Sequence, residues 1–235
     1  MKAPLFILCF ELIARGACLA QSPDVIRIKG GAVNDKAVPV SSRYRYGQFT
    51  EGKILYGNGA TAVARLNFNV LLGEVHFIDP NGDTLSLASE PVVRMVSMGP
   101  SVFWFDQRKD YLEILTDYGP VKLAVKHGLR MAKNEKLSGY DQSTGTSAVT
   151  TYQFYASGST SLRKLAEKGD LVLVKSRTFF LIDQNNRAYP LNKTNLLKSF
   201  AKHRDQISAY LTANAVDFSK EEDLKKLLQY CSELL

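Results

Sequence analysis

The chain has 235 residues, of which 45% are hydrophobic and 23% charged, and it contains 3 cysteines. This composition excludes a wholly disordered chain, a collagen-like repeat and a multi-span membrane protein, and it offers too few cysteines for a disulfide framework. The net charge is +7, and the excess of basic residues is thin and spread along the segment 129–192 instead of being gathered on one helix. Because nucleic-acid binding needs a dense basic face, we expect no nucleic-acid partner.

Residues 1–20 have the pattern of a secretory signal peptide. Lys2 precedes an apolar stretch from Ala3 to Ile13, and small residues close the segment at Ala20. Cleavage after Ala20 would leave Cys231 as the single cysteine of an exported protein, either periplasmic, outer-membrane associated or secreted. Two alternatives stay open, namely a lipoprotein anchored through Cys18 and a folded amphipathic N-terminal helix. No later segment has the roughly 20 apolar residues that a membrane-spanning helix needs.

Residues 21–131 are predicted to be a β-meander region. It begins with a mobile stretch over residues 21–39, and the strands follow. Short apolar and aromatic runs alternate with turn sequences such as Gly57-Asn58-Gly59. We expect strands at 53–56, 62–69, 74–78, 84–87, 92–98, 102–105, 111–116 and 121–126. Apolar and polar residues alternate within 64–69 and within 121–126, which predicts one buried and one exposed face for each of these strands.

Three aromatic strands end in an aspartate, at Asp79, Asp106 and Asp183. An aspartate at this position can accept hydrogen bonds from backbone N–H groups of the turn that follows. The spacings between the three are unequal, so we interpret them as recurring turn chemistry and not as a repeat array.

The remainder of the chain is predicted to contain a flexible polar loop over 132–161, returning strands within 162–192 and helices over 193–235. The returning strands lie at 170–175 and 178–182, and the helices at 193–200, 202–214 and 220–234. Asn192 is the expected cap of the first helix, and Ser219 with Glu222 forms a predicted capping box for the last.

The last two helices carry facing apolar stripes. Ile207, Tyr210 and Leu211 form one stripe, and the other consists of Leu224, Leu227, Leu228, Cys231 and Leu235. The sequence therefore predicts an α+β fold, with an antiparallel β-rich sheet or partly open barrel and a C-terminal helical hairpin packed on the sheet.

No catalytic, cofactor or metal-binding motif is present in the sequence, and we predict no cofactor. The candidate ligand-binding residues are Arg43, Tyr44, Arg45 and Tyr46, because cations beside aromatic rings can stack on sugars or pair with phosphates. The alternative for this stretch is an amphipathic edge strand.

Other chemistry-bearing residues have structural interpretations. The series Asp79, Asn81, Asp83 and Glu90 has the spacing of a calcium loop, but Thr84 stands where such a loop needs glycine, so a hairpin turn is expected. The histidines at 76, 127 and 203 have no metal-ligand spacing. We expect Cys231 to be a packed thiol and Trp104 to be a core residue.

The segments 48–54 and 66–79, together with the C-terminal helices, resemble a group of exported bacterial proteins of unknown function. The resemblance covers most of the chain after residue 20 and concerns strands, turns and helix caps. It implies export and this architecture, and it implies no activity or site.

Two functions follow from these observations as hypotheses. The first is a non-enzymatic envelope protein that binds a protein, glycan or lipid partner. The second is a hydrolase whose acidic residues are brought together only by the fold, with Asp79, Asp106, Glu113 and Asp183 as the candidates.

Overall fold

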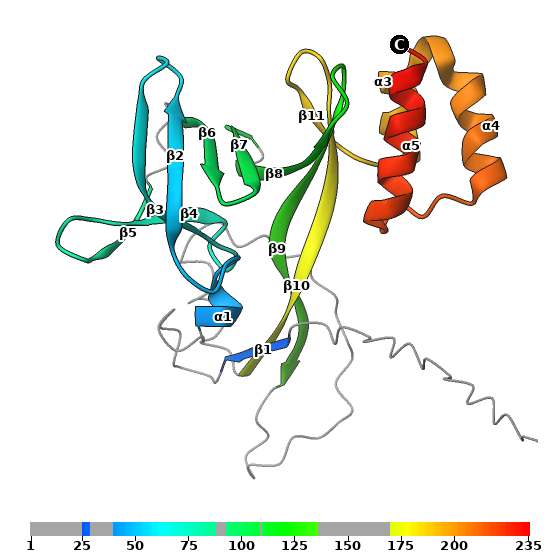
Figure 1. Ribbon diagram of the computed structural model, residues 1–235. Coiled ribbons are helices and arrows are strands. Elements are labelled where there is room, and N and C mark those ends of the chain that lie inside the picture. The colour runs from blue at the N-terminus through cyan, green and yellow to red at the C-terminus, as the bar shows by residue number, and fades with distance from the viewer. Residues whose placement is uncertain (1–24, 29–39, 88–92, 109, 136–169) are drawn as a thin grey trace, which may run out of the picture.

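The computed structural model describes residues 25–28, 40–87, 93–108, 110–135 and 170–235 (Figure 1). The predicted signal peptide at residues 1–20 lies outside the described residues. The predicted polar loop lies outside them from residue 136 onward, and so do the first residues of the predicted returning strands, 162–169.

Eleven strands form one antiparallel sheet, and they follow each other in the order β1-β10-β9-β8-β7-β6-β2-β3-β4-β5, with β11 paired to β10. Two meanders, β2 to β5 and β6 to β10, join where β6 pairs with β2. The strands are β1 (Val25–Ile28), β2 (Thr50–Tyr56), β3 (Thr61–Asn69), β4 (Glu74–Ile78), β5 (Thr84–Ser86), β6 (Val93–Met98), β7 (Ser101–Asp106), β8 (Asp110–Asp117), β9 (Lys122–Glu135), β10 (Asp170–Ile182) and β11 (Ala188–Pro190).

The predicted antiparallel α+β architecture is confirmed. Within the described residues the two ends of the sheet, β1 and β5, do not pair with each other, so the sheet stays open. The predicted aspartate turns are also confirmed. Asp79 Oδ1 accepts from the backbone N–H groups of Asn81 and Asp83, and Asp106 and Asp183 play the same role in their own turns.

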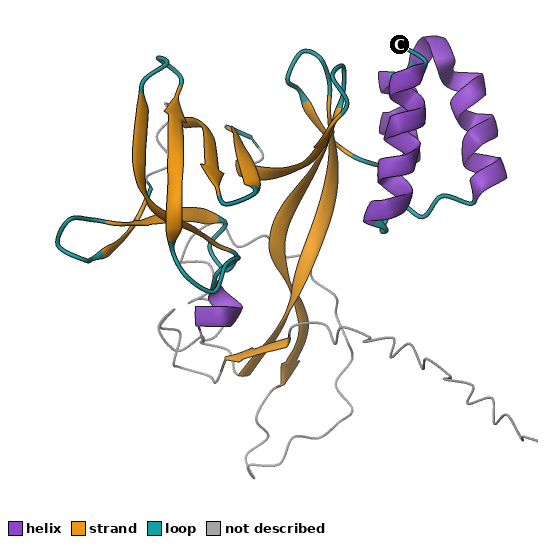
Figure 2. Ribbon diagram, in the orientation of Figure 1, coloured by secondary structure: helices purple, strands orange, loops and turns teal. Residues whose placement is uncertain are grey.

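The helices are α1 (Val40–Arg43), α3 (Lys193–Ser199), the 3-10 helix η2 (Ala201–His203), α4 (Arg204–Asn214) and α5 (Glu221–Glu233). Figure 2 shows that the last four gather at one end of the molecule, beyond the long hairpin of β9 and β10. Asn192 caps α3 as predicted, because its Oδ1 accepts a hydrogen bond of 2.9 Å from the N–H of Asn195.

Two hydrophobic cores lie on one face of the sheet. The first consists of side chains from β2, β3, β4, β6, β7 and β8, including Ile54, Leu66, Phe68 and Phe103. The second lies where α3, α4 and α5 cover β9 and β10, and its buried members are Val121, Leu123, Val125, Phe179, Leu181, Leu191, Leu196, Leu197, Phe200, Ile207, Leu211, Leu224, Leu227, Leu228 and Cys231. The predicted helical hairpin on the sheet is therefore confirmed.

Strands β9 and β10 bury side chains on both faces. Leu123 and Leu181 are direct partners on the face that the helices cover. Ala124 and Phe180, the next pair along, belong to a smaller cluster on the opposite face, against which Trp104 packs. Both faces are apolar here, which explains why residues 179–182 form a continuous apolar run instead of an alternating one.

Some predicted boundaries differ from the structure. The strands expected at 170–175 and 178–182 are one continuous strand, β10, because β9 pairs along its full length with a single register shift. Strand β9 continues to Glu135, past the predicted start of the polar loop. The stretch 21–39, expected to be mobile, contains β1, which pairs with β10.

The predicted capping box of the last helix is wrong. Helix α5 begins at Glu221 and its cap, Lys220, makes no side-chain hydrogen bond to the helix. The backbone and hydroxyl of Ser219 both donate to Asp217 Oδ1, so its side chain is used in the preceding turn. Leu235, predicted to extend the apolar stripe, is 65% exposed.

The predicted exposed face of residues 64–69 is confirmed at Arg65, which is exposed, and is wrong at Asn67 and Asn69, which are fully buried. The side chain of Asn67 accepts from the N–H of Tyr46 and donates to its carbonyl, in the manner of a neighbouring strand. Asn69 Oδ1 accepts from the N–H groups of Leu71 and Leu72 in the turn that follows β3. Backbone groups therefore replace water as partners of the Asn67 amide and of the Asn69 amide oxygen, whereas the Asn69 amide nitrogen has no hydrogen-bond partner within the described residues.

Candidate functional site

A charged cluster lies around Glu113, in the middle of β8. Phe103, Glu113 and Val125 are direct neighbours across β7, β8 and β9, so their side chains share one face of the sheet. Phe103 belongs to the first core and Val125 to the core beneath the helices. Glu113, only 4% exposed, thus lies at the boundary between the two cores.

Three side chains from different parts of the chain bind the Glu113 carboxylate. The hydroxyl of Ser101, at the start of β7, donates to Oε1 at 2.5 Å. His127 Nε2, from β9, is hydrogen bonded to Oε2. The guanidinium of Arg45, which precedes β2, lies 3.4 Å from both oxygens. Arg45 reaches the cluster because its backbone N–H donates to the carbonyl of Phe68 and holds this segment beside β3.

These contacts keep Glu113 ionised. Burial on its own would raise the pKa of this carboxyl, but the hydrogen bonds from His127 and Ser101 and the charges of His127 and Arg45 outweigh burial and lower the pKa to about 2. A carboxyl that stays ionised at every physiological pH cannot supply a proton as a general acid.

The cluster contains the residue types of a serine hydrolase triad in the wrong order. In such a triad the histidine stands between the serine and the acid, because it must take the proton of the hydroxyl. Here Glu113 stands between the serine and the histidine, and its carboxylate accepts the hydrogen bond of the Ser101 hydroxyl directly. The geometry therefore fits an anchor for Arg45 and three strands better than it fits an activated nucleophile.

The four candidate ligand-binding residues have different environments. Tyr44 is buried and its hydroxyl is 3.0 Å from His76 Nδ1, so its ring belongs to the core. The guanidinium of Arg43 lies 5.1 Å from the Tyr44 ring centroid. The side chain of Arg45 is 41% exposed, and its guanidinium lies 5.5 Å from the centroid of the half-buried Tyr46 ring. The exposed part of the predicted site is thus centred on Arg45.

The tyrosine at 46 borders the same cluster. Burial raises the pKa of Tyr46 against the lowering effect of Ser101, and the nearby Glu113 raises it further. The phenol therefore stays protonated, and its ring forms one wall beside the Arg45 guanidinium. Glu113 holds the Arg45 guanidinium, and Asn67 holds the backbone of Tyr46, so the cation and the aromatic ring lie side by side.

The carboxylates considered for a hydrolase are not brought together. Asp79, Asp106 and Asp183 each accept backbone hydrogen bonds in separate turns, and Glu113 binds Arg45, Ser101 and His127. Across the described ranges, no hydrogen bond or ion pair joins two of these four residues, and no group of three or more His, Cys, Asp or Glu side chains is arranged to hold a metal ion.

The histidines and the cysteine have structural partners. His76 contacts Tyr44, and its Nε2 lies 3.5 Å from Glu74 Oε2; His203 contacts Gln206.

Cys231 is fully buried among the leucines of α5, and burial raises the pKa of its thiol to about 12. The predicted packed thiol is therefore confirmed. Trp104 packs partly buried against the smaller apolar cluster, as expected.

The sequence pattern pointed to Glu113 only as a possible catalytic acid and did not predict that it binds Arg45, Ser101 and His127. The signal in the sequence is a single charged residue within the apolar run Tyr111-Leu112-Glu113-Ile114-Leu115. The partner Arg45 lies 68 residues earlier, so no local pattern connects the two.

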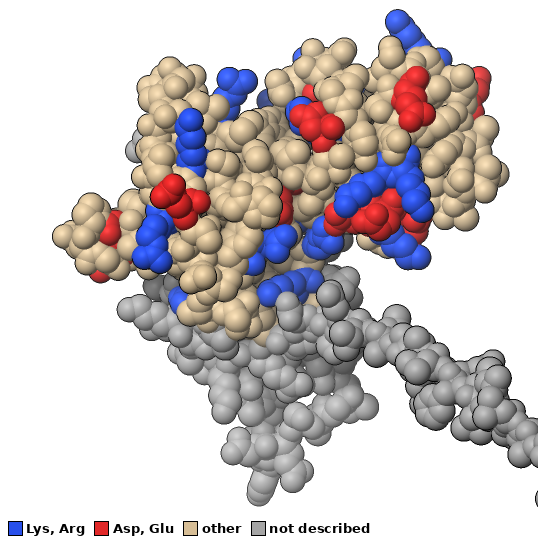
Figure 3. All heavy atoms as spheres, in the orientation of Figure 1, with Lys and Arg blue, Asp and Glu red and all other residues tan. Residues whose placement is uncertain are grey.

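Comparisons with known proteins add nothing to this geometry. No family model matches the chain, and no similar protein was found among curated proteins or solved structures. No helix within the described residues has the length and apolar character needed to cross a membrane. Figure 3 shows basic and acidic side chains intermingled on the face it draws, so no large area of one charge dominates that face.

Proposed function

We propose that the protein is an exported, non-enzymatic component of the cell envelope that binds a protein, glycan or lipid partner at the surface around Arg45. The observation that carries this proposal is the fixed position of Arg45. A half-exposed guanidinium is held against a buried carboxylate at 3.4 Å and flanked by a tyrosine ring. A cation and an aromatic ring fixed together bind with little loss of conformational freedom, and such pairs suit sugars and acidic groups.

Export is the second part of the proposal and rests on the leader pattern of residues 1–20. Mass spectrometry of the protein isolated from its own cells tests it. A mature N-terminus at Gln21 supports a free exported chain, and a lipid on Cys18 supports an anchored one. Recovery of the intact chain with Met1 in the cytoplasm would contradict export.

Binding is tested with the purified protein lacking residues 1–20. Cosedimentation with isolated cell-wall polymer, and with vesicles of extracted envelope lipid, compares the wild type with Arg45→Gln. The matched control is Arg94→Gln, which removes an exposed arginine from β6. We expect at least a fivefold loss of binding for Arg45→Gln and none for the control.

The hydrolase alternative is tested by incubating the same polymer with the wild type and two further variants, Ser101→Ala and Glu113→Gln. Release of soluble fragments from the polymer by the wild type, abolished in both Ser101→Ala and Glu113→Gln, would replace the binding proposal. Equal binding by all variants would also overturn the role of Arg45.

A further inference from the structure

The charges of the C-terminal helices are divided into two halves. Residues 193–204 contain three lysines and one arginine and no acidic residue, whereas residues 205–235 contain six acidic residues and three lysines. Counted together the two halves nearly cancel, which is why the net charge of this region hides the division. The basic half covers α3, η2 and the first residue of α4.

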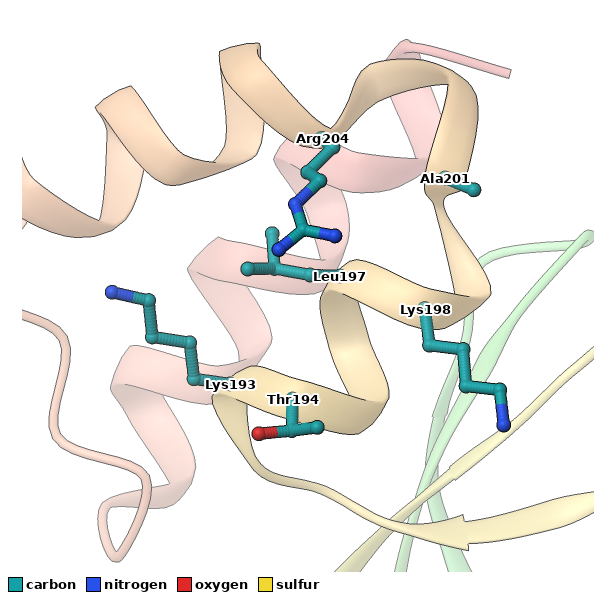
Figure 4. Close-up of a pocket in the computed structure, with 6 residues that line it drawn as sticks. All are labelled: Lys193, Thr194, Leu197, Lys198, Ala201 and Arg204. Carbon is teal, nitrogen blue, oxygen red and sulfur yellow. The ribbon is translucent and has the colours of Figure 1, made fainter.

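A groove of about 540 Å³ lies in this basic half, and it is lined by Lys193, Thr194, Leu197, Lys198, Ala201 and Arg204. Figure 4 shows the guanidinium of Arg204 extending from the start of α4 over Leu197, with Lys193 and Lys198 on either side. The volume falls within the range of about 300 to 1,000 Å³ that is usual for small-molecule sites.

The three cations of the groove have no acidic partner among the residues that the structure describes. Elsewhere in the structure cations pair with acids: Lys126 with Asp110, Arg177 with Glu221 and Lys225 with Glu222 are examples. Within the described part of the chain, Lys193, Lys198 and Arg204 have no carboxylate at ion-pair distance, and none lines the groove. Figure 4 shows the amino groups of Lys193 and Lys198 turned outward on opposite sides of Arg204, so both flexible side chains must turn inward to meet an anion bound by the guanidinium.

The backbone under the groove is fixed. Leu196 and Leu197 of α3 and Phe200 after it are buried in the core beneath the helices. Asn192 caps α3, and the N–H of Phe200 donates to the carbonyl of Leu196. The three cationic side chains therefore extend from anchored positions, and only side-chain freedom is lost when they close on a ligand.

We propose that this groove binds a phosphate group carried by an anionic small molecule or lipid headgroup. Arg204 offers a planar pair of N–H donors that matches two phosphate oxygens, Lys193 and Lys198 supply two further charges, and Thr194 adds a hydroxyl donor. Leu197 and Ala201 give the groove an apolar floor for the carbon skeleton that carries the phosphate. This site shares no residue with the surface around Arg45, so the two proposals stand or fall separately.

Calorimetric titration with glycerol 3-phosphate at physiological ionic strength tests the site, and flotation with vesicles containing 30% phosphatidylglycerol tests the lipid source. The groove variant is Lys193→Gln/Lys198→Gln/Arg204→Gln. Its control, Lys53→Gln/Arg94→Gln/Lys226→Gln, removes the same charge from exposed positions outside the groove. Circular dichroism verifies that both triple variants are folded. If the triple groove variant is not folded, the single variant Lys198→Gln is tested in its place.

We expect the groove variant to weaken binding at least tenfold and the control to stay within twofold of the wild type; Lys198→Gln alone should weaken it about threefold. Binding of glycerol 3-phosphate without binding of vesicles identifies a soluble phosphate ester as the ligand class, and binding of vesicles identifies a lipid headgroup. Equal losses in both triple variants would show attraction by net charge alone and overturn the site. Absence of binding to both probes would overturn it as well.

Discussion

Glu113 shows how one side chain can join two hydrophobic cores. Among the described residues it is the one acidic side chain that the fold buries. Its partners come from β7, β9 and the segment before β2, so the carboxylate connects parts of the sheet that no single pair of strands brings together.

Replacement of Glu113 by Gln should lower the free energy of unfolding by about 3 kcal/mol, since removal of one member of a buried ion pair leaves the other members without charge compensation. Urea denaturation measures the effect. The matched control is Glu51→Gln, an exposed acid on β2, which should change stability by less than about 0.5 kcal/mol. A loss at Glu113 no larger than that at Glu51 would contradict the anchoring role.

The same carboxylate predicts an acid-dependent loss of stability. Because folding lowers the pKa of Glu113 from 4.5 to about 2, its contribution is complete above pH 4.5 and is lost as the pH falls toward 2. We therefore expect the stability gap between wild type and Glu113→Gln to close over this interval. Other acids with lowered pKa, such as Glu74 and Glu221, are present in both proteins and cancel in the comparison. A gap that stays constant down to pH 2 would refute the assignment.

At the level of single residues the sequence pattern predicted less than it did for whole elements. The positions of Arg45 and Tyr46 at a surface were compatible with the sequence, but the burial of Tyr44 depends on His76 in β4, a distant partner. Asn67 and Asn69 look like the exposed half of an alternating strand. Their amides are buried because they imitate backbone hydrogen bonding, which a polarity pattern does not reveal.

Among the elements, α3 and α5 begin differently, and this difference is measurable. Asn192→Ala removes the hydrogen bond to the N–H of Asn195 and should cost about 1 kcal/mol. Ser219→Ala should cost less than about 0.5 kcal/mol, because its hydroxyl donates to Asp217 and does not cap α5. Thermal unfolding of the two variants side by side distinguishes them. A larger loss of stability for Ser219→Ala than for Asn192→Ala would show that Ser219 caps α5 after all.

Strand β2 approaches its neighbour closely at Gly52. A Cβ added there would lie 2.5 Å from the carbonyl oxygen of Ser97 and 2.8 Å from a methyl group of Leu66. Gly52→Ala should therefore destabilise the protein by about 2 kcal/mol. Gly47→Ala is the control, since no atom lies within 4 Å of its added Cβ. Denaturant midpoints that are equal for both variants would contradict this packing at the joint between the meanders.

Most strands and helices could be predicted because their signals are local. Asp79, Asp106 and Asp183 close their turns with hydrogen bonds to residues two to four positions later, so the turns are visible in short segments. Strand β1 was not predicted, because the described strand that pairs with it, β10, is more than one hundred residues away. The basic groove was not predicted for a different reason: its residues are close in the sequence, but their charge is visible only when residues 193–204 are separated from the acidic stretch after them.

The whole molecule should unfold as one unit, since β9 and β10 support both the helices and the opposite face of the sheet. Three probes in the protein lacking residues 1–20 test this: fluorescence of Trp104, the single tryptophan; helical circular dichroism; and labelling of the buried Cys231 thiol. The urea transitions should coincide for all three.

Leu228→Ala, in the core beneath the helices, should shift all three transitions together by about 3 kcal/mol, whereas Leu235→Ala, at an exposed position, should leave them unchanged. Labelling of Cys231 at urea concentrations where Trp104 fluorescence is still native would show that the helices detach from the sheet independently.

The double burial of β9 and β10 limits how the chain length can change during evolution. A one-residue insertion within either strand would turn Leu123 or Leu181 away from the helices and turn Ala124 or Phe180 toward them, so both layers would be disrupted by a single event. Strand β5, whose three residues are exposed at the edge of the sheet, carries no such constraint. Insertions and deletions in related chains should therefore collect near β5 and avoid β9 and β10.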